Sequence, residues 1–142
     1  MKISDVNAFK GKFKDAIVSW SDGIVDQMFP SRVAVRTLLK NARSNVLVRL
    51  DDKINKMVDT AFLMLGDANG VVDTDSAIDL LCDMFKEMPQ KDYSFGGLGA
   101  KVGKGEILIQ FPHNFFSDFF VGDMGGVKLT TEDIKQLKNY LN

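Results

Sequence analysis

The sequence is poor in the residues that build most catalytic and metal centres. It has one cysteine, one histidine and one tryptophan among 142 residues. A single cysteine excludes a disulfide within the chain and is typical of a reducing compartment. Zinc sites need three or four good ligands, which Cys82 and His113 do not supply. A small enzyme using Cys82 and His113 as a nucleophile and base is the remaining catalytic alternative, although Cys82 falls on an apolar helix face where burial is expected.

The sequence also lacks the features that direct proteins to membranes, and it has no overall charge that attracts nucleic acid. No apolar run approaches the ~20 residues needed to cross a bilayer. The first fifteen residues lack the apolar core of a signal peptide. A formal net charge of -1 gives no overall attraction to phosphate-rich surfaces. We therefore expect a cytoplasmic protein, or one incorporated in a particle assembled there, with no membrane partner.

What the sequence does contain is typical of a globular chain. Apolar residues make up 45% and charged residues 26%, and this length favours one domain over residues 1–142. Apolar spacings of three and four predict helices over 5–28, 31–65 and 75–87, and a further helix capped by Thr130. Within the second helix, the weak stretch 41–45 predicts a kink or a break.

The stretch from residue 93 to residue 111 has a different character. It is rich in glycine, and apolar residues alternate over 107–111, which is typical of a β-strand. The turn 103–105 allows this strand to pair with 98–102. We predict an α+β fold: a mostly helical single domain with four to six helices and a small antiparallel β-hairpin around 93–111.

Two stretches resemble ligand-binding loops in composition but not in spacing. In GDANGVVDTDS, placing Gly70 at the sixth position of a calcium loop puts Leu65 at the first and Ser76 at the twelfth, where oxygen ligands are required. In GGLGAKVGKGE, only three residues separate Gly99 from Gly103, whereas a phosphate loop needs four. We predict a capped turn, a tight hairpin and no cofactor.

The acidic turn has an echo 56 residues later, where GDMGGVKLTTEDIKQL repeats much of GDANGVVDTDSAIDLL. One interpretation is that turns and helix caps draw on a small set of residues, so that two such units converge. The other is a related pair of units in which Val71 and Val127 form an antiparallel bridge. The sequence leaves both interpretations open.

Two surfaces are candidates for binding a partner. The first is a basic face formed by Arg32, Arg36, Lys40 and Arg43, within a segment from 31 to 50 that has five cations and no acid. The second is an aromatic cluster formed by Phe115, Phe116, Phe119 and Phe120, too many for one side of a short helix.

Each surface has more than one interpretation. The basic face is a solvated face, a contact for an acidic protein, or a track for nucleic-acid phosphates. The aromatic cluster is central to the core or faces a partner chain.

The function follows mainly by subtraction, because no catalytic constellation, metal cage or cofactor loop is evident. We expect no enzyme but a protein-interaction or assembly subunit, such as a component of a larger homo- or hetero-oligomeric, phage-like or virus-like particle. Self-association or a protein partner is expected. The alternative is a nucleic-acid-associated accessory protein that uses the basic face.

Overall fold

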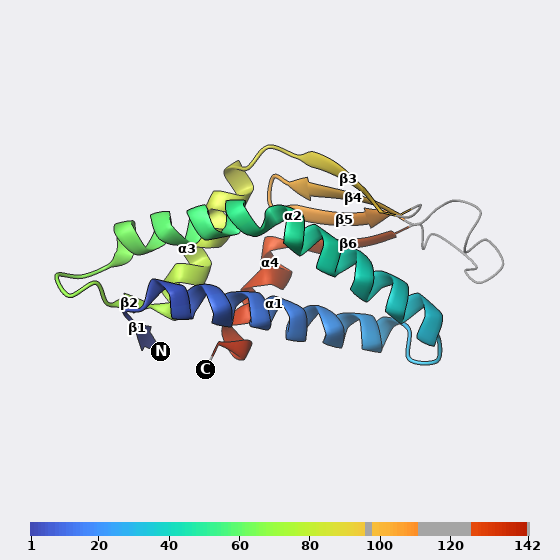
Figure 1. The fold of residues 1–142 in the computed structure, drawn as a ribbon, viewed down its shortest axis with the longest axis horizontal. Coiled ribbons are helices and arrows are strands. Elements are labelled where there is room, and N and C mark those ends of the chain that lie inside the picture. The colour runs from blue at the N-terminus through green and yellow to red at the C-terminus, as the bar shows by residue number, and fades with distance from the viewer. Residues whose placement is uncertain (96–97, 111–125, 142) are drawn as a thin grey trace. The chain divides into compact units, whose positions relative to one another are not determined.

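The computed structural model describes residues 1–95, 98–110 and 126–141, and its chain combines long helices with two antiparallel sheets (Figure 1). The predicted α+β, mostly helical fold is confirmed. The chain divides into two compact units, Met1–Leu81 with Lys135–Asn142, and Cys82–Ile134. The first unit is built on helices and the second on a sheet. A single domain over all 142 residues stays a prediction.

Helices α1 (Val6–Met28) and α2 (Val33–Leu65) run antiparallel to each other in the helical unit (Figure 1). Helix α1 begins where the side chain of Asp5 accepts hydrogen bonds from the backbone N–H groups of Asn7 and Ala8, an N-cap that satisfies otherwise unpaired donors. It ends before Pro30, as expected from the sequence. A connection of only four residues brings the second helix back along the first.

Helix α2 is continuous through 41–45, so a break there is wrong, and the alternative of a kink stays a prediction. The Ser44 hydroxyl does not cap a new helix; it donates to the Lys40 carbonyl one turn earlier, at 3.0 Å. Ala42 is buried, and Arg43 is held by side chains of α1. Tertiary contacts therefore keep a stretch of weak helix formers helical.

The core of the helical unit lies on the predicted apolar stripes. Phe9 is fully buried, with its ring 5.9 Å from that of Phe13 and 5.2 Å from that of Phe62. The C-terminal 3₁₀ helix η1 (Lys135–Tyr140) packs on α1. The buried apolar residues of the unit are Phe9, Phe13, Ala16, Trp20, Phe29, Leu39, Ala42, Val58, Ala61, Val72, Ala77, Ile78, Leu81, Leu137 and Leu141.

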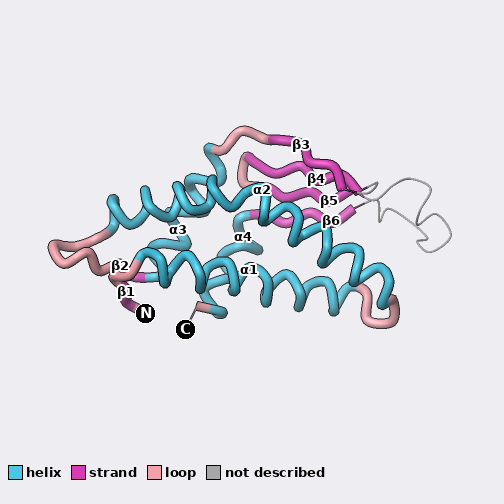
Figure 2. The backbone as a smooth tube through the Cα atoms, in the orientation of Figure 1, coloured by secondary structure: helices cyan, strands magenta, loops and turns pink. Residues whose placement is uncertain are grey.

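A two-stranded sheet ties the start of the chain to the segment after α2 (Figure 2). Strand β1 (Lys2–Ile3) pairs antiparallel with β2 (Val72–Asp73). The Thr74 N–H also donates to the Met1 carbonyl, at 2.8 Å. The first residues are therefore held by backbone hydrogen bonds.

The acidic turn before α3 (Thr74–Glu87) uses its carboxylates within the chain. Asp67 accepts hydrogen bonds from the backbone N–H groups of Val71 and Asn69, and Asp73 accepts them from the N–H and hydroxyl of Ser76. These bonds hold the pKa of both aspartates below the ordinary value. The geometry matches the predicted capped turn.

The second unit contains a four-stranded antiparallel sheet in the order β3-β4-β5-β6 (Figure 1). The predicted hairpin is present as its two central strands, and two further strands flank it. Lys104 and Gly105 both have positive φ, at 52° and 77°, as a two-residue type I′ turn requires. The strands are β3 (Lys91–Phe95), β4 (Leu98–Gly103), β5 (Glu106–Gln110) and β6 (Gly126–Thr130).

The turn between β4 and β5 closes the C-terminus of α3. The N–H of Lys104 donates to the Met88 carbonyl at 2.7 Å, and the N–H of Gly105 donates to the Phe85 carbonyl at 3.0 Å. Backbone carbonyls at a helix end lack partners within the helix. The N–H groups of the β-turn are the partners of these carbonyls. The hydrogen bonds therefore fix one end of the sheet against the end of α3.

Of the two interpretations of the echo, the one with a bridge between Val71 and Val127 is wrong. Val127 pairs with Ile109 in the four-stranded sheet. In the other stretch it is Val72 that pairs, and its partner is Ile3. The two segments therefore belong to different sheets.

The echo extends to the order of elements but not to the way each helix begins. After β6, the short helix α4 (Thr131–Ile134) follows directly, just as α3 follows β2. At α4 the acid lies inside the helix, and Asp133 accepts from the N–H of Thr130 at 2.8 Å. At α3 the acid lies before the helix. The two units share their order of strand and helix but cap the helix differently. This favours the interpretation that the two units converged because turns and caps use a small set of residues.

Candidate interaction surface

Arg43 of the predicted basic face is directed toward α1. Its Nη1 forms an ion pair with the Asp22 carboxylate and donates to the Ser21 hydroxyl at 2.9 Å and to the Val18 carbonyl at 3.2 Å. Its side chain is only 16% exposed. Arg43 is therefore part of the contact between the two helices.

Lys40 and Arg36 share one aspartate of α1. The Lys40 Nζ lies 2.9 Å from an Asp26 carboxylate oxygen, and the Arg36 Nε lies 3.7 Å from the same oxygen. The hydrogen bond from Lys40 holds the pKa of Asp26 below its ordinary value, with the nearby charges of Lys40 and Arg36 adding to the effect. Arg32, the fourth residue, is exposed and immediately precedes α2.

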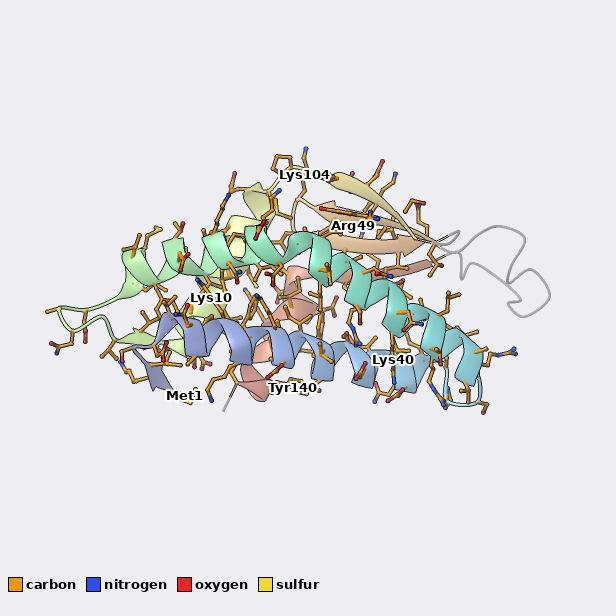
Figure 3. The ribbon with its side chains drawn as sticks, in the orientation of Figure 1. Met1, Lys10, Lys40, Arg49, Lys104 and Tyr140 are labelled. Atoms are coloured by element: carbon orange, nitrogen blue, oxygen red, sulfur yellow. The ribbon has the colours of Figure 1, made fainter. Side chains whose placement is uncertain are left out.

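The opposite half of the helix pair carries the same arrangement with the signs exchanged. Here the cations are on α1: Lys10 lies 2.8 Å from Asp59, and Lys14 pairs with Asp51. Figure 3 shows Lys10 and Lys40 between the two helices, in opposite halves of the pair. Charge blocks of alternating sign thus match along an antiparallel pair and would clash in a parallel one.

The charge pattern of the sequence indicates this pairing, but the prediction of a basic face did not take the aspartates before it into account. The cation-rich, acid-free stretch 31–50 is preceded by 15–28, which has three aspartates and no cation. Two helices joined by a short connection pack antiparallel, so these blocks had to meet. The basic face and its acidic partner belong to one chain.

With its cations turned inward, α2 presents an uncharged outer face along its first half. From Val33 to Val48, every exposed residue of α2 is uncharged. We define the outer face of α2 by ten of its exposed residues: Val33, Ala34, Thr37, Asn41, Ser44, Asn45, Val48, Asp52, Lys56 and Leu63. Other residues in the second half of α2 are exposed as well, namely Arg49, Lys53, Asp59, Thr60, Met64 and Leu65.

The outer face includes the most exposed large apolar side chains among the described residues. Val33 is 66% exposed, Val48 is 76% exposed and Leu63 is 87% exposed. Met64, next to Leu63, is 66% exposed. Scattered exposed apolar residues are ordinary on a protein surface. Several of them along one helix, with no exposed charge from Val33 to Val48, are typical of a contact surface.

The other sequence candidates are placed differently. The aromatic cluster Phe115, Phe116, Phe119 and Phe120 lies outside the described residues, as does His113. Cys82 is buried in α3, with its Sγ 3.9 Å from the Thr131 carbonyl oxygen.

Neither a metal cluster nor a membrane-spanning helix occurs in the part of the chain that the structure describes. Within 1–95, 98–110 and 126–141, no group of three or more His, Cys, Asp or Glu residues is arranged to hold a metal ion. Among the helices in those same ranges, none is long and apolar enough to cross a membrane.

Comparison with known proteins gives no relative. No protein-family model matches the sequence, no curated protein matches it, and no solved structure matches the fold. The candidate surface is therefore interpreted from its own residues.

Proposed function

We propose that the protein is a non-enzymatic protein-interaction or assembly subunit that binds its partner through the outer face of α2. The observation that carries this proposal is the exposure of Val33, Val48 and Leu63 on a helix whose neighbouring cations pair with α1. Burying apolar surface gains about 25 cal/mol per Å². A partner that covers the first half of this face gains that energy without having to desolvate an exposed charge of α2.

The composition of the face supports a protein partner. Cores of protein–protein interfaces are depleted in charged residues, and the exposed positions from Val33 to Val48 have none. Thr37, Asn41 and Ser44 are short side chains that allow close approach of another helix. A homo- or hetero-oligomer, such as a phage-like or virus-like particle assembled in the cytoplasm, is the kind of assembly that we propose.

The alternative, a nucleic-acid-associated protein, has less support from the charges. Phosphate contacts need cations free to meet the backbone. Lys40 and Arg36 have Asp26 beside them, and Arg43 has Asp22. Each aspartate would remain close to any phosphate bound there and would repel it. We therefore favour the protein partner.

The proposal is tested by measuring the mass of the protein in solution. Sedimentation velocity or light scattering should give a mass above the 15.8 kDa of one chain, or a complex with a purified partner. Val48→Glu should reduce that association, whereas Lys12→Glu, at an exposed position of α1, should not. An association that Val48→Glu leaves unchanged would contradict a role for the outer face.

The nucleic-acid alternative has its own test. Binding of plain duplex DNA that weakens steeply with salt, and that is lost in Arg32→Glu and Arg36→Glu variants with unchanged circular dichroism, would support it. Absence of such binding at low salt would count against it.

A further inference from the structure

We infer that the outer face of α2 binds the same face of a second copy of this chain, in an antiparallel arrangement with a two-fold axis at Val48. The inference rests on the proposed function and names its partner. It follows from three features of the outer face: the spacing of its apolar residues, the order of its charges and the period of the exposed pattern.

The apolar residues are spaced symmetrically along the helix. Val33 and Leu63 each lie fifteen residues from Val48, a distance of about 22 Å along the helix axis. A two-fold axis at Val48 therefore places Val33 of one copy opposite Leu63 of the other, and the two Val48 side chains opposite each other. Each of the three exposed apolar positions meets an apolar partner, as an isologous interface requires.

The charges of the outer face fit an antiparallel pair and not a parallel one. In the second half of α2, Asp52 and Lys56 are exposed together with Arg49, Lys53 and Asp59, whereas the exposed residues of the first half are uncharged. In the antiparallel register, Asp52 comes opposite Ser44, whereas Lys53 and Lys56 come level with Arg43 and Lys40, whose charges are already paired with aspartates of α1. In a parallel two-fold pair, Asp52 would meet Asp52 and Lys56 would meet Lys56, which costs free energy.

The period of the pattern also defines how the helices cross. Fifteen residues make close to four helical turns, or about 3.75 residues per turn, against 3.6 for a straight α-helix. A contact line with a period above 3.6 winds to the right around the helix. We therefore expect the two copies of α2 to wrap around each other in a right-handed sense.

Disulfide trapping in the full chain tests the arrangement. Because Cys82 is buried, thiols added at exposed positions should be the ones that react under native conditions. Val48→Cys should form a covalent dimer on mild oxidation, since its two copies meet at the axis. A mixture of Val33→Cys and Leu63→Cys chains should form the mixed dimer, whereas Val33→Cys alone should not, because its two copies lie about 45 Å apart. Lys12→Cys, at an exposed position of α1, controls for random collision.

A second variant tests the energetics independently of thiol chemistry. Val48→Glu brings two carboxylates together at the axis and should raise the dimer dissociation constant at least about tenfold. The side chain is exposed, so circular dichroism should show an unchanged fold.

Several outcomes would overturn the inference. A Val33→Cys homodimer that forms as readily as the mixed dimer would indicate a parallel pair. Failure of Val48→Cys to cross-link above the Lys12→Cys control would exclude the axis at this residue. A wild-type chain that stays monomeric at all concentrations would exclude self-pairing, while leaving the proposed function open to a different protein partner. An oligomer that resists Val48→Glu would place its interface elsewhere.

Discussion

The helix pair and the four-stranded sheet hold their neighbours together by different means. Along α1 and α2, the side chains do so: apolar stripes face each other and five ion pairs join the two helices. At the β4–β5 turn the backbone does so, with N–H groups on the carbonyls at the end of α3. An ion pair between two side chains can be replaced by another pair of opposite charges. Where one backbone segment packs directly against another, there is no space for a larger side chain.

The largest effect is expected at Gly103, where the sheet unit depends on a missing side chain. Its φ is 143°, and an added Cβ would lie 2.4 Å from the Pro89 carbonyl oxygen. Gly103→Ala should lower the free energy of unfolding by about 3 kcal/mol, measured by urea denaturation. Gly99→Ala is the matched control in the same strand, because its Cβ would lie 3.7 Å from the nearest side-chain atom. Equal losses in the two variants would contradict this explanation.

A smaller loss, with recovery, is expected for the helix pair. Arg43→Asp should lower the free energy of unfolding by about 2 kcal/mol, because it brings two carboxylates together at a largely buried site. Adding Asp22→Arg restores opposite charges and should recover at least half of the loss in a double-mutant cycle. The more exposed pair of Lys10 and Asp59, exchanged in the same way, should change stability by less than about 1 kcal/mol. If the double variant is no more stable than Arg43→Asp alone, the geometry of this site contributes more to stability than the signs of the two charges.

A glycine in the helix pair should respond in the opposite direction to Gly103. A Cβ added at Gly11 of α1 would meet nothing within 4 Å. Gly11→Ala should raise the free energy of unfolding by about 0.5–1 kcal/mol, because alanine loses less backbone entropy in a helix. Thermal unfolding followed by circular dichroism measures the gain. A lower melting temperature would mean that Gly11 has a role in packing that its surroundings do not show.

The smallest effect is expected from acid. Because the pKa of Asp26 is lower in the folded chain than its ordinary value of 3.8, its contribution is present above that pH and is lost as the pH falls through the folded pKa. Asp26→Asn should therefore be less stable than the wild type at neutral pH and equal to it in strong acid, by urea midpoints at each pH. Asp15→Asn, at an exposed position of α1, is the control for removing one carboxylate from this helix. A gap that persists in acid would indicate a packing effect.

Local spacing was enough to predict most of the helices and the central hairpin. Apolar residues three and four apart predict helices close to α1 and α2, and the glycines at 103–105 predict the turn between β4 and β5. These features depend on neighbours in the sequence. The continuity of α2 does not, because contacts with α1 outweigh the weak helix formers at 41–45.

The pairings between strands that are far apart in the sequence were not predicted. Ile109 pairs with Val127, and Ile3 pairs with Val72; in each case, many residues separate the partners. The two GV segments resemble each other, which favoured pairing them with one another. Similar sequence does not imply contact, because a strand pairs with the edge that the rest of the chain brings beside it.

The candidate surface was predicted only in part. The cations of the basic face were identified, but not the aspartates of α1 that pair with three of them. Val33, Val48 and Leu63 lie among many other apolar residues of α2, and nothing in their spacing distinguished them from core positions. Burial is settled by which side of α2 the neighbouring elements cover, and that requires the fold.

The alternating charge blocks of α1 and α2 have a consequence for the order of assembly. Every one of their ion pairs would form equally well if α1 of one chain lay on α2 of another, so the blocks alone allow exchange of helices between copies. Arg36 favours the closed form, because its Nη1 donates to the carbonyls of Phe29 and Pro30 in the connection, at 3.0 and 2.5 Å. Those bonds fix the reversal within one chain. They favour the hairpin closed within one chain over exchange of helices between chains, and in that closed form the cations of α2 that pair with α1 are no longer free to pair elsewhere.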